Sequence, residues 1–223
     1  MNDVIIVAAG SGSRMKLNYN KQFALLNGKP MIAWTIEKYY NHENIDNIYL
    51  AIRPEDQDLM EKILNKYNLN RVNIVYGGKE RQDSIYNCLK QMGKSDYILV
   101  HDGARPFVDK DIIDRSIKAT KIHKATCVGV PSKDTIKRVD DSDIIKDTPN
   151  RQFLWCAQTP QSFEASLIKN AYEYAYENNI SATDDASLVE AIGYKVKMVM
   201  GSYENIKITT PEDLAYGQYI LNK

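Results

Sequence analysis

Short apolar segments alternate with helix-like segments through the first half of this 223-residue chain. Four segments have the length and composition of buried strands: Val4–Val7, Ile48–Ile52, Val72–Val75 and Tyr97–Val100. Three segments between them place apolar side chains at helical spacing: 30–40, 55–67 and 83–89. In the second of these, Leu59, Ile63 and Leu64 form the expected inner face. This alternation predicts one α/β domain over residues 1–223, with a mostly parallel sheet covered on both faces.

The first predicted strand opens into a loop of small residues, Ala8-Ala9-Gly10-Ser11-Gly12-Ser13-Arg14-Met15, with Lys21 shortly after it. Small residues let backbone N–H groups approach an anion closely, and the two cations can place positive charge beside it. The pattern indicates a site for a phosphorylated ligand. A dehydrogenase fingerprint needs a third glycine where Met15 stands, and the chain contains no P-loop. A tight connection whose glycines serve only geometry is the alternative.

Two further loops carry groups that suit a nucleotide and a metal ion. One is Gly77-Gly78-Lys79-Glu80-Arg81-Gln82-Asp83-Ser84, after the third strand, and the other is His101-Asp102-Gly103-Ala104-Arg105-Pro106, after the fourth. Ligands of open α/β sheets bind beyond the carboxyl ends of the strands. We therefore expect these loops to share one edge of the sheet with the first loop.

Asp102 directly follows the fourth predicted strand. Mg²⁺ is commonly held by only one or two carboxylates together with phosphate groups, so Asp102 is a candidate metal ligand. The alternative is that it pairs with Arg105 or caps the next turn. His101, beside it, is interpreted as a packed or hydrogen-bonded residue and not as a catalytic one.

Charge and cysteine content exclude some classes of protein. Lys+Arg and Asp+Glu are equal at 29 each, and this balance disfavours a general nucleic-acid binder. The cysteines Cys88, Cys127 and Cys156 are far apart, which predicts free thiols in a reducing compartment. The first apolar run is too short for a signal peptide, and we find no segment of membrane-spanning length. We therefore expect a cytoplasmic protein that is not bound to membranes.

Residues 131–156 depart from the alternation. Segments 135–139 and 144–146 predict a hairpin around the acidic turn Asp140–Asp143. A hairpin this polar has little core of its own and is marginal alone. We expect it to pack on a second copy of the chain as a dimerisation arm; a solvated excursion is the alternative.

The last third of the chain returns to regular elements. Segments 164–178 and 186–192 predict helices, and 195–199 predicts a strand. Residues 211–221 predict a closing helix, for which Thr210 is the expected cap.

Seven segments, spread in order from Val4 to Leu214, resemble a known family. The first loop with Lys21-Gln22 resembles the signature loop of sugar-phosphate nucleotidyltransferases. The other six segments are similar to the 2-C-methyl-D-erythritol 4-phosphate cytidylyltransferase family: Gly77–Ser84, Val100–Pro106, Asp134–Lys137, Gln158–Phe163, Thr183–Ser187 and Asn205–Leu214. The resemblance implies a Rossmann-like three-layer nucleotidyltransferase fold, with a mostly parallel twisted sheet and a protruding β-arm.

The resemblance also implies an activity: Mg²⁺-dependent transfer of CMP from CTP to 2-C-methyl-D-erythritol 4-phosphate, in non-mevalonate isoprenoid synthesis. The implied products are 4-diphosphocytidyl-2-C-methyl-D-erythritol and pyrophosphate. The implied catalytic residues are Arg14, Lys21, Arg151 and Lys207. The implied nucleotide-binding residues are Ala8, Ala9, Gly10, Gly12, Gly77, Gly78, Ser84 and Asp102, the last of which also holds Mg²⁺. The polyol phosphate would be held, partly across a homodimer interface, by Arg105, Thr135, Arg151, Thr183 and Lys207.

The chain departs from the family at Asn20, where proline is usual, and this predicts a looser loop that still leaves Lys21 in place. A pentitol-phosphate cytidylyltransferase, for example one acting on ribitol 5-phosphate, shares the fold and the first loop. It ranks second because Asp134–Arg138 and Gly103-Ala104 are more similar to the isoprenoid enzyme. A catalytically silent nucleotide-binding regulator is the alternative of another class. It is disfavoured by the joint presence of Arg14, Lys21, Asp102, Arg151 and Lys207.

Overall fold

A seven-stranded sheet forms the centre of the computed structural model, which describes residues 1–10 and 20–223. The strand order is β11-β7-β10-β6-β1-β4-β5. The strands are β1 (Asn2–Val7), β4 (Asn47–Ile52), β5 (Val72–Tyr76), β6 (Tyr97–Asp102), β7 (Ala125–Pro131), β10 (Trp155–Glu164) and β11 (Lys197–Met200). Neighbours pair in parallel except at β10, which is antiparallel to both β6 and β7. The predicted mostly parallel sheet is confirmed.

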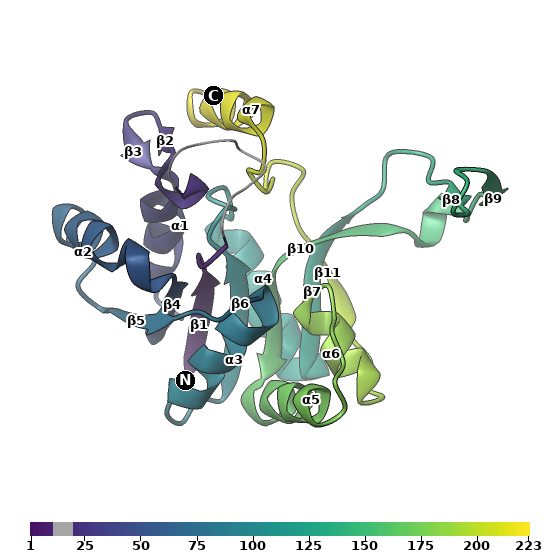
Figure 1. The fold of residues 1–223 in the computed structure, drawn as a ribbon, viewed down its shortest axis with the longest axis horizontal. Helices are drawn as coiled ribbons and strands as arrows, with labels where there is room; N and C mark the ends of the chain where they lie inside the picture. The colour runs from purple at the N-terminus through teal and green to yellow at the C-terminus, as the bar shows by residue number, and fades with distance from the viewer. Residues whose placement is uncertain (11–19) are drawn as a thin grey trace.

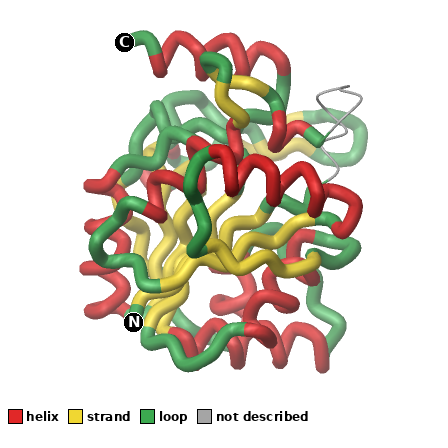
Figure 2. Tube along the Cα trace, turned by 90° about the vertical axis from the view of Figure 1, so that its left-hand side faces the viewer, coloured by secondary structure: helices red, strands yellow, loops and turns green. Residues whose placement is uncertain are grey.

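Helices cover both faces of the sheet, as Figure 1 and Figure 2 show. One face packs against α1 (Met31–Tyr40), α2 (Gln57–Lys66) and α4 (Lys110–His123). The other packs against α3 (Arg81–Gln91), α5 (Ala165–Glu177) and α6 (Asp185–Ala191). The helix α7 (Pro211–Leu221) lies near the small hairpin of β2 (Leu25–Leu26) and β3 (Lys29–Pro30). The three-layer α/β architecture is therefore confirmed.

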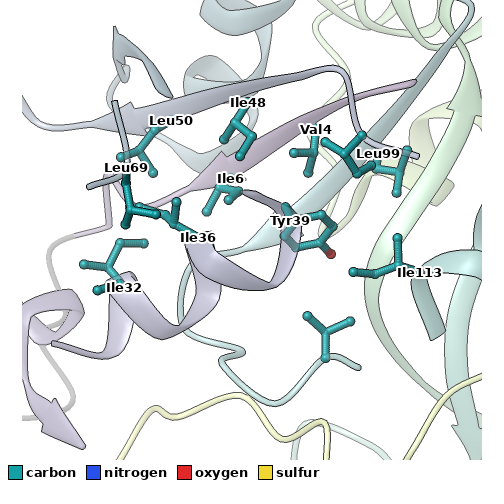
Figure 3. Packing of buried hydrophobic residues seen from close by; sticks show 14 of the residues in the cluster. Val4, Ile6, Ile32, Ile36, Tyr39, Ile48, Leu50, Leu69, Leu99 and Ile113 are labelled. Carbon is teal, nitrogen blue, oxygen red and sulfur yellow. The ribbon is translucent and has the colours of Figure 1, made fainter. Parts of the chain in front are cut away.

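The strand β1 shows why these sequences form inner strands. Successive side chains of a strand point to opposite faces, so a strand covered on both faces is apolar throughout. Val4 and Ile6 join the cluster under α1, where Figure 3 shows Ile6 beside Ile36 and Val4 toward Leu99 and Tyr39. Ile5 joins the cluster under α3 and α5. These apolar strand residues are fully buried. Because β1 packs against helices on both faces of the sheet, the position of its carboxyl end is fixed.

The sequence analysis omitted α4, β7 and β10. The strand β10 lacks a clear apolar pattern because several of its buried side chains are polar. Gln161 donates to Asp184, and Ser162 exchanges a hydrogen bond with Ser116. Hydrogen bonds to residues distant along the chain let these polar side chains be buried, whereas hydrophobic periodicity alone predicts that polar side chains are exposed.

Two local predictions need correction. Leu59 was expected on the inner face of α2 but is 45% exposed, and Met60 is buried in its place. The helix α3 begins at Arg81 and not at residue 83, because Glu80 and Asp83 form a capping box around its first turn.

The predicted hairpin is present. The short strands β8 (Arg138–Val139) and β9 (Ile145–Asp147) pair in antiparallel fashion at the tip of an arm that extends from β7 and β10 (Figure 1). Its apolar side chains are exposed, including Ile144 at 64% and Phe153 at 75%.

The closing helix α7 has the cap that the sequence predicts. The Thr210 hydroxyl accepts from the backbone N–H of Asp213, and the Asp213 carboxylate accepts from the N–H of Thr209 and Thr210. Just before this cap, the Ile208 N–H donates to the carbonyl oxygen of Ala104. The segment that carries Lys207 is thereby tied to the loop after β6.

Replacing Leu50 tests this account of the core. Leu50 is fully buried in β4, and Leu50→Ala is expected to lower the free energy of unfolding by about 2–5 kcal/mol, because it removes buried methyl groups and leaves a cavity. Urea denaturation measures the change. The matched control is Leu59→Ala on the exposed face of α2, which should cost less than about 1 kcal/mol. Equal losses at the two leucines would contradict the account.

Candidate active site

A cleft of about 830 Å³ lies where the loops after β1, β5 and β6 meet. The prediction that these loops share one edge of the sheet is confirmed. The cleft is lined by residues predicted for the site: Ala9, Gly10, Lys21, Gly77, Gly78, Ser84, Asp102 and Lys207. Arg53, Glu80 and Arg81 line it too, although none of the three is among the predicted site residues.

The loop after β5 packs too tightly for side chains at its glycines. A Cβ added at Gly77 would lie 2.4 Å from the Cβ of Ala9 and 2.8 Å from the hydroxyl of Ser84. The buried Ser84 hydroxyl accepts from the Gly78 N–H at 3.1 Å and donates to the Glu80 carbonyl at 3.0 Å. The small residues of the two loops therefore bring their backbones together at the base of the cleft.

Asp102 is the last residue of β6, and its carboxylate is surrounded by cations. Lys207 Nζ lies 2.8 Å from Oδ2, Arg81 Nε 3.3 Å from Oδ1, and Arg105 Nε 3.6 Å from Oδ2. Burial alone would raise the pKa of Asp102, but these cations hold it well below its usual range. Asp102 is therefore a permanent anion that fixes positive charge at the cleft.

Arg81 joins Asp102 to a second buried acid. Its guanidinium donates to both oxygens of Asp185, at 3.1 Å and 2.7 Å. Asp185 is fully buried, and Tyr172 donates to it through its hydroxyl at 2.6 Å. Burial opposes the charge on Arg81, but Asp185 and Asp102 outweigh it and raise the pKa of the guanidinium. Asp102 and Asp185 thus fix the position and charge of Arg81, and no local sequence spacing predicts these contacts.

The segment before α7, which carries Lys207, accepts hydrogen bonds from the side chains of Lys21 and Arg105. Lys21 is 8% exposed, and its Nζ donates to the carbonyl oxygen of Ile208 at 3.3 Å. Arg105 donates to the carbonyl of Asn205 at 2.8 Å. Since Lys207 lies between these two acceptors in the chain, one backbone segment gathers the cations around the cleft.

The expectation that Asn20 loosens the first loop concerns residues 11–19, which lie outside the described residues, so it stays a prediction; Asn20 itself is described. Asn20 is 3% exposed, and its side chain accepts from the N–H of Gln22 at 3.2 Å. It is the N-cap of η2 (Lys21–Phe23), the short 3₁₀ turn that begins with Lys21.

His101 has a structural part, as the sequence analysis expected. Its Nε2 lies 3.0 Å from the carbonyl oxygen of Arg105, which can only accept, so the ring proton is assigned to Nε2. Nδ1 then accepts from the Thr159 hydroxyl, whose oxygen accepts from the N–H of Asp102. Burial lowers the pKa of His101 to about 4, so the ring is neutral and holds the backbone on both sides of Asp102.

The structure does not bring all predicted residues to the cleft. Thr135 and Arg151 are exposed on the arm, where Arg151 donates to the carbonyl of Lys133. Thr183 is exposed in the turn before α6, and Ala8 is buried behind the cleft. Gly12 and Arg14 lie outside the described residues, so their roles stay predictions.

The donor set limits the kind of metal that the site can take. Among the described residues, no group of three or more His, Cys, Asp or Glu side chains is placed to hold a metal ion. A lone carboxylate at Asp102 fits a hard cation that receives its other ligands from phosphates and water, as Mg²⁺ commonly does.

Comparison with known proteins assigns the family. The family model described as IspD, 2-C-methyl-D-erythritol 4-phosphate cytidylyltransferase, matches residues 3–223. The chain belongs to this family. It is 59% identical over 224 residues to the 2-C-methyl-D-erythritol 4-phosphate cytidylyltransferase of Clostridioides difficile (strain 630), with 100% of this chain and 94% of the relative covered. The predicted family and enzyme class are confirmed: the protein is a cytidylyltransferase.

Solved structures agree with this assignment. A 4-diphosphocytidyl-2C-methyl-D-erythritol synthase from Anaerococcus prevotii matches with a TM-score of 0.90 and 36% identity, covering 100% of this chain and 96% of that one. The cytidylyltransferase from Francisella tularensis matches with a TM-score of 0.82 and 33% identity, covering 98% of each chain. In the part of the cytidylyltransferase that the structure describes, no helix is long and apolar enough to cross a bilayer.

Removing Arg81 tests the buried ion pairs of the enzyme. Arg81→Ala leaves the Asp185 carboxylate buried without its cation and is expected to lower the free energy of unfolding by about 3–5 kcal/mol. The control is Lys110→Ala, which breaks the exposed pair with Glu43 and should have a much smaller effect, because solvent screens that pair. Urea denaturation compares the two, and a loss at Arg81 no larger than at Lys110 would contradict the arrangement.

Proposed function

We propose that this cytidylyltransferase transfers CMP from CTP to 2-C-methyl-D-erythritol 4-phosphate, with release of pyrophosphate and 4-diphosphocytidyl-2-C-methyl-D-erythritol. The observation that carries the proposal is the cleft itself, in which fixed cations surround Asp102 beside a glycine-rich strand end. Such a site suits a polyphosphate and one carboxylate-bound cation. The identity of the polyol phosphate is taken from the names of the relatives.

The nucleotide is proposed to bind across the first loop. Backbone N–H groups around Ala9, Gly10 and Gly12 are proposed to face the phosphates, because small residues let the chain approach them closely. Ala8, whose N–H donates to the carbonyl oxygen of Ala51, is proposed to support this loop from behind. Gly77 and Gly78, positioned by Ser84, face the cytosine, whose edge backbone groups can recognise. The tight packing at Gly77 supports this, since it leaves the backbone and not a side chain at the surface of the cleft.

Catalysis is proposed to depend on position and charge. An oxygen of the polyol phosphate attacks the α-phosphorus of CTP, a new P–O bond forms, and the bond to the pyrophosphate oxygen breaks. The attacking oxygen is anionic at neutral pH, so no general base is required. Lys21 and Arg14 are proposed to stabilise the charge that develops on the α-phosphate oxygens. Lys21 is buried and anchored, so it need not reorganise as that charge develops.

Asp102 is proposed to hold Mg²⁺. When bound there with the triphosphate, the ion would neutralise phosphate charge. Arg105 and Lys207, which already contact Asp102, are proposed to orient the phosphate of the second substrate. The shared carboxylate keeps these two side chains at a set distance from the nucleotide site.

The arm is proposed to complete the site across a homodimer. Thr135 and Arg151, together with Thr183, are proposed as substrate-binding residues, and Arg151 also as a catalytic residue. The arm supports this, because it exposes apolar side chains away from the core: Ile136, Val139, Ile144, Ile145 and Phe153. We further propose one nucleotidyltransferase domain over residues 1–223, with residues 131–156 as the dimerisation arm, acting in the cytoplasm.

A pyrophosphate-release assay tests the substrate. The enzyme is incubated with Mg²⁺, CTP and either 2-C-methyl-D-erythritol 4-phosphate or ribitol 5-phosphate. We expect the methylerythritol phosphate to give a kcat/KM at least about 10² higher, since a site built for one set of hydroxyl groups rejects a mismatch. Faster turnover of ribitol 5-phosphate would establish the pentitol-phosphate alternative instead. Absence of pyrophosphate release with either substrate would contradict the proposed reaction.

A further inference from the structure

A second buried carboxylate, separate from Asp102, lies near the carboxyl end of β1. Asp56 ends η3 (Pro54–Asp56), and its side chain is 9% exposed. Arg53 donates from Nε to Oδ2 at 2.8 Å and from Nη2 to Oδ1 at 2.9 Å. This is a bidentate pair, the strongest geometry between these groups. Since Arg53 lines the cleft, Asp56 fixes a cleft residue from behind.

Asn20 completes this cluster. Its Nδ2 donates to Oδ2 of Asp56 at 2.8 Å and to the carbonyl oxygen of Ala8 at 3.4 Å. Its Oδ1 accepts from the N–H of Gln22. A carboxylate and a carbonyl only accept, and a backbone N–H only donates, so the partners determine the orientation of the amide. Asn20 therefore joins the end of β1, the start of η2 and the Arg53–Asp56 pair.

We propose that Asn20 is a positioning residue for Lys21: by its bond to Asp56 it fixes the turn from which the Lys21 ammonium reaches the cleft. This inference rests on the proposed function, which gives Lys21 its part in the reaction. Lys21 follows Asn20 directly and is held at its far end by the carbonyl of Ile208. Anchoring both ends of the side chain limits where the ammonium can lie. Displacements of about 1 Å at such a group can cost on the order of 10² in rate.

Helix capping alone does not account for this arrangement. An N-cap needs only the acceptor oxygen of the side chain, which Gln22 already uses. The Nδ2 group adds a buried contact with a carboxylate 36 residues away in the chain. The two parts can be separated, because aspartate caps a helical turn as well as asparagine but cannot donate to Asp56 when ionised.

The first experiment is Asn20→Asp, assayed by pyrophosphate release at pH 8 relative to the wild type. An ionised aspartate at position 20 cannot donate to Asp56 and places a second negative charge beside it. We expect kcat to fall about tenfold or more, with a smaller change in KM for CTP. Asn70→Asp, the same change at an exposed position, is the control. A kcat that stays near the wild-type value, or a loss that appears in KM for CTP alone, would overturn the proposal.

The second experiment asks whether the effect passes through Lys21. Lys21→Ala is expected to lower kcat by about 10² or more, as removal of one charge-stabilising donor does. Adding Asn20→Asp to Lys21→Ala should then lower kcat no further, because residues that act as a unit are not additive. A full additional loss would show that Asn20 acts elsewhere. A near-normal kcat in Lys21→Ala would overturn the proposed role of Lys21 itself. If Lys21→Ala loses activity strongly while Asn20→Asp keeps a normal kcat, the proposed role of Lys21 stands and the positioning role of Asn20 is overturned.

A third variant keeps the test decisive if Asn20→Asp folds poorly. The exchange Asn20→Asp with Asp56→Asn restores one amide and one carboxylate across the same contact. We expect it to regain at least about half of the kcat lost at pH 8, with melting temperatures measured alongside. Failure of a folded double variant to recover activity would contradict the proposal.

Discussion

The Asp102 carboxylate is the interaction on which the rest of the site depends. It contacts Arg81 from α3, Arg105 from the loop after β6, and Lys207 from the segment before α7. A buried carboxylate is costly unless it is paired, and cations near one another repel unless an anion lies between them. The three cations therefore make the burial of the carboxylate possible, the carboxylate holds the cations close together, and the pairing joins elements that are far apart in the chain.

The same principle recurs around Lys21. There the buried anion is Asp56, paired with Arg53 and contacted by Asn20, and the turn it holds carries the lysine. A polyphosphate site must keep several cations close together before the ligand arrives. Fixing each by a buried carboxylate or a backbone carbonyl prepares the charge in advance, so that less reorganisation is needed when the ligand binds.

Much of the fold could be predicted because the inner strands are apolar on both faces. β1 and β6 have that pattern, and the glycine loops and Asp102 stand at strand ends where the topology collects ligands. The strand β10 could not be found in this way, since Gln161 and Ser162 are buried by hydrogen bonds to distant partners.

The ion pairs of the site were hidden for a similar reason. Arg81 and Asp185 are 104 residues apart, and Asn20 and Asp56 are 36 apart, so no local spacing reveals either contact. The residue types at the site could be listed from the sequence and its family resemblance. The contact of Asp102 with Arg105 was foreseen as the alternative to a metal ligand, because the two residues are close in the sequence. The pairings of Arg81 with Asp185 and of Asn20 with Asp56 depend on the folded chain.

The most direct measurement is calorimetric binding of CTP, with and without Mg²⁺, to the wild type and to Asp102→Asn. Asp102→Asn removes the anion that holds Arg81, Arg105 and Lys207 in place, so the variant should bind metal-free CTP more weakly than the wild type. Asp102 is also the proposed ligand of Mg²⁺. The gain in affinity on adding Mg²⁺ should fall by about tenfold or more. An unchanged gain from Mg²⁺ in Asp102→Asn would contradict the account.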